Sequence, residues 1–215
     1  MVFDIYRNES IKNAEIVRRS TGNLLFKKIF ENQQIKQWNA FLPSAIHKTA
    51  LINFLVEDWE EIAPHLLEEK VLFFAFEEKC YCFSQHGKVE VAVLQSNQEE
   101  ANTRMLLQLK HASNNTFNKF VVHTHTDVMV LCLGSLNLID GDVYIKTGVK
   151  DKTRFVNLQE IKKKFKVVAD KIECDIEYLL KSFVCLHAFT GCDTVYREKN
   201  KAYNQLNPVP ALMLV

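Results

Sequence analysis

The order of apolar and polar positions along the chain predicts strands that alternate with helices. Residues 71–76 form one apolar run of strand length, VLFFAF, whereas residues 79–94 alternate on both sides of His86 and Gly87, which is typical of a β-hairpin. Further strands are predicted at 1–3 and 119–124, and a second hairpin at 142–158. Continuous apolar runs such as 71–76 are typical of strands that are covered on both faces of a sheet.

Apolar residues that recur every three or four positions predict the helices between these strands. In the segment 50–63 such a stripe is formed by Leu51, Phe54, Leu55, Trp59 and Ile62. We expect Thr49 to cap this helix and Pro64 to weaken its end. The other predicted helices cover 11–20, 98–113, 127–133, 159–170 and 175–189.

This succession predicts an α/β fold with a central, mostly parallel sheet flanked by helices and a β-hairpin insertion. A length of 215 residues favours a single domain over 1–215. The chain opens on MVF, which reads as the end of a strand, and closes on the apolar segment NPVPALMLV. We therefore expect this domain to be truncated at both ends.

The composition and charge of the chain exclude several classes of protein. The net charge is +1, which argues against a surface coated with basic residues for bulk nucleic-acid binding but leaves local basic patches open. The N-terminal segment lacks the apolar core of a signal peptide, and no apolar run reaches the roughly 18 residues of a membrane span. We expect an intracellular protein, nuclear or cytoplasmic, with no membrane partner and with reduced, mostly buried cysteines.

One apolar run carries polar chemistry at its midpoint. The segment KFVVHTHTDVMVL, residues 119–131, is interrupted by His123, Thr124, His125, Thr126 and Asp127. In parallel sheets the functional crevice lies at the carboxyl ends of the strands. Acidic residues follow predicted strands or open and close predicted helices at Asp4, Glu99, Glu100, Asp127 and Asp193. Carboxylates gathered at one sheet edge would hold a divalent metal ion.

Four segments in this order, VFD, EEANTRMLL, VVHTHTDVMVL and FTGCDTV, resemble the PIN-like nuclease superfamily. The likeness is to its flap-endonuclease or XPG-type branch, and is greatest to asteroid-like, transposon-associated animal proteins that carry EEADTRM, SPDTDVLVL and FTGCDTV. It spans nearly the whole chain. It implies a parallel sheet between helices and an acidic pocket in which two Mg²⁺ or Mn²⁺ ions drive hydrolysis of nucleic acid phosphodiesters.

Carried over residue by residue, the resemblance assigns the catalytic and metal-binding positions. They are Asp4, Glu100, Asp127 and Asp193. Two further metal positions depart from the family pattern, because Asn102 and His125 stand where it has acids. Each change removes a negative charge beside the metals, so we expect a weakened Mg²⁺ or Mn²⁺ site. The resemblance therefore implies an endonuclease lineage with weak activity or none.

Two functions follow. The first is a metal-dependent, structure-selective endonuclease with a partly eroded site. The alternative is a catalytically inactive PIN-like domain that binds nucleic acid or protein. We expect DNA or RNA as a partner, bound through Lys12, Arg18 and Arg19 after Asp4, although these three residues fit a solvated helix face equally well. A second basic group, Lys162, Lys163, Lys164 and Lys166, fits a solvated helix face better.

Several of these residues also fit ordinary structural roles. Asp4 alone would cap a turn, and Glu100 would complement the dipole at a helix start. Asp193 beside Gly191 fits turn chemistry. Cys185, His187 and Cys192 are expected to pack in the core, and a zinc site at Cys80, Cys82 and His86 has the wrong spacing.

Overall fold

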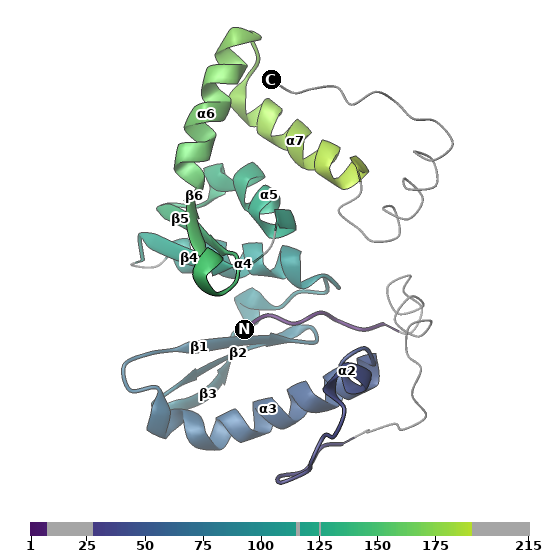
Figure 1. Cartoon of the computed structure of the whole chain (residues 1–215). Coiled ribbons are helices and arrows are strands. Elements are labelled where there is room, and N and C mark those ends of the chain that lie inside the picture. The colour runs from purple at the N-terminus through teal and green to yellow at the C-terminus, as the bar shows by residue number, and fades with distance from the viewer. Residues whose placement is uncertain (8–27, 115–116, 125, 191–215) are drawn as a thin grey trace, which may run out of the picture. The chain divides into compact units, whose positions relative to one another are not determined.

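The computed structural model describes residues 1–7, 28–114, 117–124 and 126–190 (Figure 1). The chain divides into two compact units, Met1–Leu107 and Gln108–Val215. Each contains a three-stranded sheet and helices, so the chain is mixed α/β as its sequence predicts. None of the helices in these described ranges is both long and apolar enough to cross a membrane.

The sheet of the first unit is an antiparallel meander. It consists of β1 (Leu72–Phe76), β2 (Lys79–Ser84) and β3 (Gly87–Glu90), in that order. The predicted strand 71–76 and the hairpin at His86-Gly87 are therefore confirmed. Gly87 has a φ of +103°, a conformation that residues with a side chain rarely adopt, which is why the turn needs glycine there. The shorter elements of this unit are α2 (Trp38–Phe41) and η1 (Ala92–Leu94).

Helix α3 (Ala45–Leu66) packs against β2 and β3 and confirms the predicted helix at 50–63. Of the predicted stripe, Leu51, Phe54, Leu55 and Trp59 are half-buried against core clusters, whereas the fully buried apolar residues of α3 are Ala50, Ile52 and Ala63. Its N-terminal cap is Ser44, whose hydroxyl accepts a hydrogen bond from the N–H of His47, and not Thr49 as predicted. Ser44 begins the helix one turn earlier because its own backbone is extended while its side chain satisfies a free N–H. Pro64 lies inside the last turn, and the helix ends at Leu66.

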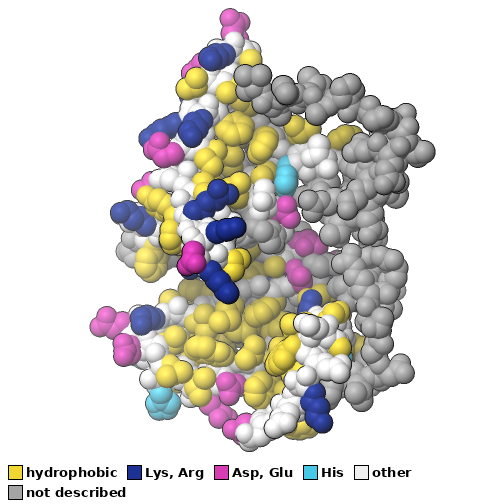
Figure 2. Space-filling model, in the orientation of Figure 1, with side chains coloured by type: hydrophobic (Ala, Val, Ile, Leu, Met, Phe, Trp, Pro, Cys, Tyr) yellow, Lys and Arg dark blue, Asp and Glu magenta, His cyan; other side chains and the backbone are white. Residues whose placement is uncertain are grey.

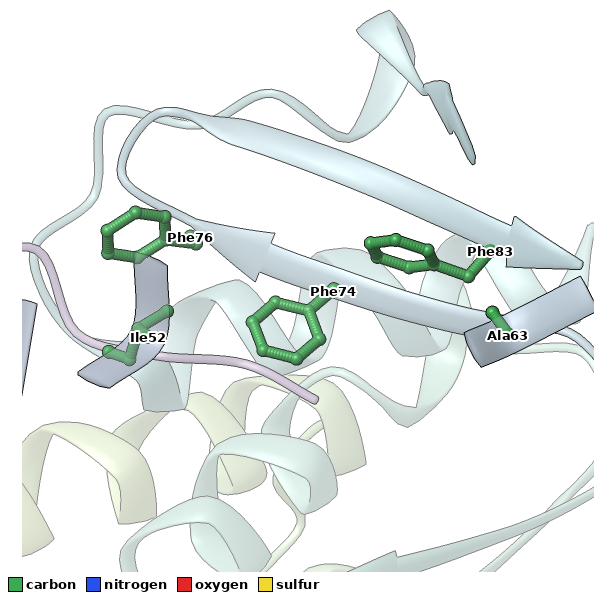
Figure 3. Close-up of a cluster of buried hydrophobic side chains, with 5 residues drawn as sticks. All are labelled: Ile52, Ala63, Phe74, Phe76 and Phe83. Carbon is green, nitrogen blue, oxygen red and sulfur yellow. The ribbon is translucent and has the colours of Figure 1, made fainter. Parts of the chain in front are cut away.

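The core of the first unit lies between α3 and the sheet. Figure 3 shows its central cluster, which comprises Ile52, Ala63, Phe74, Phe76 and Phe83. Phe74 and Phe83 are fully buried, and their ring centroids lie 6.2 Å apart in an edge-on arrangement. Phe3 of the N-terminal segment packs on the same cluster, with its ring centroid 5.0 Å from that of Phe74. Aromatic burial on this scale is the main source of stability for a small unit.

The N-terminal segment contacts β1 in parallel through a single bridge residue, where a strand at 1–3 was predicted. Val2 forms an isolated parallel bridge with Ala75, and Phe3 N–H donates to the Ala75 carbonyl at 3.1 Å. Two residues later the segment leaves β1, and Ile5 N–H donates to the carbonyl of Glu99 at 2.8 Å. The chain around Asp4 therefore runs between β1 and the residues that precede α4 (Ala101–Ser113).

The sheet of the second unit has mixed directions. β4 (Lys119–His123) pairs in parallel with β5 (Asp142–Thr147), which pairs in antiparallel with β6 (Arg154–Asn157). The predicted strand at 119–124 and hairpin at 142–158 are confirmed. The prediction of one central, mostly parallel sheet is not: among the described strands only β4–β5 and the Val2–Ala75 bridge are parallel.

Three helices pack together in the second unit, α5 (Thr126–Gly134), α6 (Leu158–Lys171) and α7 (Ile176–Thr190). The short helices η2 (Leu136–Leu138) and η3 (Lys150–Lys152) complete it. α5 and α7 pack closely at Gly134, where a Cβ atom would lie 2.5 Å from Cγ2 of Val184. Glycine fits there because a methyl group would overlap the Val184 side chain unless that side chain or its helix shifted. The predicted helix 11–20 lies outside the described residues.

Thiol accessibility provides a direct check on both units. Cys80 and Cys132 are buried, and burial raises the pKa of the Cys132 thiol to about 12. Cys185 on α7 is exposed, contrary to its predicted core position, because α7 turns this side away from α5 and α6. We expect iodoacetamide to alkylate Cys185 rapidly and the two buried thiols only after unfolding. Peptide mass spectrometry over time measures this; equal rates for Cys185 and Cys132 would contradict the described packing.

Candidate functional site

Asp4 and Glu100 meet at the start of α4 in the first unit. The Asp4 carboxylate accepts a hydrogen bond from the N–H of Ala101 at 2.8 Å, across 97 positions of sequence, and Glu100 directly precedes Ala101. Asp4 is half-buried and Glu100 is exposed. The capping role considered for Asp4 is thus present, at a helix N-terminus where negative charge is favourable. The same contact holds the two predicted carboxylates beside each other.

Tyr6 lies with these two acids. Burial, together with the negative charges of Asp4 and Glu100, raises the pKa of the Tyr6 phenol to about 12. The ring also faces Lys48, whose Nζ lies 5.6 Å from the ring centroid. At neutral pH the phenol therefore stays protonated and is a hydrogen-bond donor within an acidic cluster. Sequence reasoning missed Tyr6, because a tyrosine two residues after an acid carries no signal of its own.

We expect alkaline pH to destabilise the first unit through Tyr6. Because the phenol's pKa is about 12 in the folded chain, above its ordinary 10.0, the unfolded state loses the proton first. Stability is unaffected well below pH 10 and falls as the pH rises toward 12. The loss is on the order of 1 kcal/mol, since solvent screens a half-buried group. Urea unfolding at several alkaline pH values measures it, and Tyr6→Phe should remove this part of the slope; an unchanged slope would contradict the placement.

Arg7 and Glu99 lie next to this acidic cluster on its solvent side. The guanidinium of Arg7 lies 3.8 Å from a Glu99 carboxylate oxygen and 3.2 Å from one of Glu78, and it donates to the carbonyl of Asn97 at 3.0 Å. Glu99 is therefore held by a cation, whereas Glu100 lies beside Tyr6. Asn102, half-buried, is the second residue of α4.

Arg104 anchors the backbone that carries Asp4. Its side chain is 1% exposed, and its two terminal nitrogens donate to the carbonyl of Phe3 at 2.9 Å and to that of Lys79 at 3.3 Å. Its Nε has no hydrogen-bond partner among the described residues. Burial lowers the pKa of Arg104, while Cys80 and Asp4 act in the opposite direction, and the guanidinium remains charged. Sequence reasoning missed this role because arginine is seldom fully buried.

Asp127 of the second unit pairs with a histidine. Nε2 of His187 on α7 lies 3.0 Å from Oδ1 of Asp127, and both side chains are half-buried. Asp127 is in the first turn of α5 and His187 in the last turn of α7, the ends at which the helix dipoles favour an acid and a base. His187 was predicted to pack in the core. The structure instead gives the predicted metal ligand Asp127 a polar partner.

Five predicted site residues lie outside the described residues. They are Lys12, Arg18, Arg19, His125 and Asp193. Within the described ranges, no group of three or more His, Cys, Asp or Glu side chains is placed to hold a metal ion. The structure thus brings together Asp4 and Glu100, and joins Asp127 to His187. Convergence of all the predicted ligands in one pocket stays a prediction.

The lysines of α6 lie on an exposed helix face, as predicted. Lys163 pairs with Glu160 at 2.6 Å and Lys166 with Asp170 at 2.8 Å, all on exposed side chains. These pairs raise the pKa of both lysines through hydrogen bonds to the carboxylates. The arrangement is that of a solvated helix face on which neighbouring charges are opposite in sign.

Comparison with known proteins adds no relative. The chain matches no family model, and it matches neither a curated protein nor a solved structure. The resemblance to PIN-like nucleases therefore rests on the four sequence segments alone. Two acidic positions are defined by their geometry, Asp4 beside Glu100 and Asp127 beside His187.

Proposed function

We propose that the chain is a PIN-like domain of the flap-endonuclease branch, acting on nucleic acid through a partly eroded acidic metal site. The observation that carries this proposal is the meeting of Asp4 and Glu100 at the start of α4. Both positions are acidic ligands in the family pattern, and they are distant in sequence. Their shared influence on the pKa of Tyr6 supports a common acidic cluster.

The donor set of this cluster suits a hard divalent cation. Asp4 and Glu100 supply carboxylate oxygens, and Asn102, two residues after Glu100, has an amide oxygen to offer. Mg²⁺ or Mn²⁺ held there would stabilise the charge that develops on a phosphodiester during hydrolysis. The protonated phenol of Tyr6 adds a hydrogen-bond donor beside these acids, and Arg104 holds the backbone of residue 3. In the second unit, Asp127 is a ligand position in the family pattern and is paired with His187.

The second candidate function is binding of nucleic acid without cleavage. It is favoured by Asn102, which lies at the start of α4 beside the two acids and brings no charge. Replacing one carboxylate by an amide next to a dication forfeits a large electrostatic attraction. A chain of this kind would keep the fold and the nucleic-acid surface while losing catalytic metal occupancy.

Metal affinity of two neighbouring acid variants tests the proposal. We expect Glu100→Gln to weaken Mn²⁺ binding by about tenfold or more, since it removes a ligand charge. Glu99→Gln is the matched control, because Glu99 is paired with Arg7, and it should bind Mn²⁺ like the parent. Isothermal titration with Mn²⁺ measures both. Equal affinity in the two variants would contradict a metal site at Glu100.

Cleavage separates the two candidate functions. The purified chain is incubated in Mn²⁺ with flap, hairpin and single-stranded DNA and RNA, beside an Asp127→Ala, Asp193→Ala double variant. Cutting by the parent alone supports the nuclease; binding without cutting supports the alternative. Asn102→Asp with His125→Asp should raise Mn²⁺ affinity by restoring two charges. If this double variant binds Mn²⁺ no better than the parent, positions 102 and 125 do not face the metal.

A further inference from the structure

One face of the β4–β5–β6 sheet is open and mixes aromatic with basic side chains. Strand register fixes which residues share it: His123 lies opposite Lys146, and Lys146 lies opposite Phe155. The next row across the same face is Val121, Tyr144 and Asn157. Because side chains of a strand alternate between faces, these two rows stand on one side of the sheet.

The exposed fractions of its side chains show that this face is open to solvent. Val121 is 60% and Phe155 59% exposed, while Tyr144 and Lys146 are half-buried. On the opposite face Phe120, Val143 and Ile145 are buried. Val121 on β4 and Phe155 on β6 stand on this face with β5 between them, so their apolar surface is open to a partner.

Basic residues lie on the open face and in the connection beside it. Lys119 and Lys146 stand on this face with Asp142, and Lys150 and Lys152 lie in η3, between β5 and β6, with Asp151. Arg154, opposite Thr147, stands on the other face. The bases outnumber the acids although the whole chain has a net charge of only +1. Figure 2 shows Lys and Arg side chains gathered over the region in which Figure 1 labels β5 and β6. This local excess favours a polyanionic partner.

We propose that this face, called the open sheet face below, binds single-stranded nucleic acid. Phe155 and Tyr144 provide flat rings on which unpaired bases stack, and the lysines neutralise the phosphates between them. A duplex keeps its bases stacked inside, so it would gain the charge contacts alone. The inference rests on the proposed function for its partner class, and adds the surface and the preference for single strands.

Binding measured without metal tests this surface independently of the acidic site. Fluorescence anisotropy is recorded in EDTA with labelled DNA and RNA oligonucleotides of about 15 nucleotides and with a duplex of the same length. We expect Phe155→Ala to weaken single-strand binding by at least about fivefold, the usual minimum for losing one stacked base. Lys146→Gln should lower the slope of log K against log salt by about 0.7.

Two control variants match these changes elsewhere on the chain. Phe30→Ala removes a phenylalanine that is 63% exposed in the first unit, and Lys164→Gln removes an exposed charge on α6. Both should bind like the parent. Circular dichroism confirms folding of every variant, and Phe155 and Lys146 are not fully buried, so both substitutions are tolerable.

The outcomes separate this inference from the proposed function. The proposal for the open sheet face is overturned if the parent does not bind single strands. It is also overturned if Phe155→Ala and Lys146→Gln both bind single strands as tightly as the parent does. A parent that sedimentation shows to be a dimer and that Phe155→Ala converts to a monomer overturns it as well, since a second copy then covers the face. None of these results depends on Mn²⁺, and the comparison of Glu100→Gln with Glu99→Gln stands or fails separately.

Discussion

Phe74→Ala is expected to lower the free energy of unfolding of the first unit by about 3–5 kcal/mol. Phe74 is fully buried in the middle of the cluster that α3 covers, and its ring contacts Phe3 and Phe83. Truncation removes its transfer free energy and leaves a cavity that the surrounding rings fill only partly. Urea unfolding followed by tryptophan fluorescence measures the loss, because Trp59 packs on the same cluster.

A loss of this size is comparable to the whole stability of a small unit. The matched control is Val89→Ala on β3, where the side chain is 64% exposed, and we expect a change within about 0.5 kcal/mol. If Phe74→Ala cost no more than Val89→Ala, the side chain of Phe74 would not lie in the core, and the pairing of β1 with β2 would need revision.

Arg104→Met should destabilise the first unit by about 2–4 kcal/mol and also weaken Mn²⁺ binding. The substitution keeps an apolar stem but removes both hydrogen bonds, so the carbonyls of Phe3 and Lys79 lose this donor. Phe3 directly precedes Asp4, so the carboxylate loses part of its positioning. Arg104→Lys should restore little, because one ammonium does not reproduce the planar fork that reaches two carbonyls.

Arg7→Met is the control for charge. Arg7 is about half exposed and pairs with Glu78 and Glu99, so its loss should cost less than about 1 kcal/mol. Unfolding and Mn²⁺ titration are measured on both variants. A stability loss for Arg104→Met without any change in Mn²⁺ affinity would leave Arg104 a structural residue only. Equal effects for both arginines would contradict the burial of Arg104.

The elements were predictable where the signal is local. The hairpin at His86-Gly87 carries its own turn residue, and the helix at 50–63 its own apolar stripe. Strand direction was not predictable for β1. Its antiparallel partner β2 follows a turn at Glu77 and Glu78, and Glu77 adopts a φ of +49° without being glycine. Two consecutive glutamates are not a sequence signal for a turn, so the apolar run at 71–76 was interpreted as a parallel strand.

The candidate site was predictable to the extent that it depends on acids at element boundaries. Asp4 and Glu100 were expected to lie together with the other acids, and in the first unit the Asp4 carboxylate accepts from the N–H of Ala101, the residue after Glu100. The residues that support them were not expected. Arg104 and His187 occupy positions on helices whose stripes were assigned to apolar packing, and each instead places a polar group on a buried or half-buried partner. Such roles depend on what another element presents, which sequence spacing does not reveal.

The close approach of α5 and α7 at Gly134 has a consequence for Asp127. Gly134 and Asp127 lie seven residues apart on α5, about 10 Å along the axis, and they meet Val184 and His187 of α7. The two helices are thus joined at two points, by the contact of Gly134 with the Val184 side chain and by the hydrogen bond between Asp127 and His187. A side chain at position 134 would push α7 away from α5 at Val184. It would thereby increase the distance between the His187 imidazole and the Asp127 carboxylate without contacting either residue.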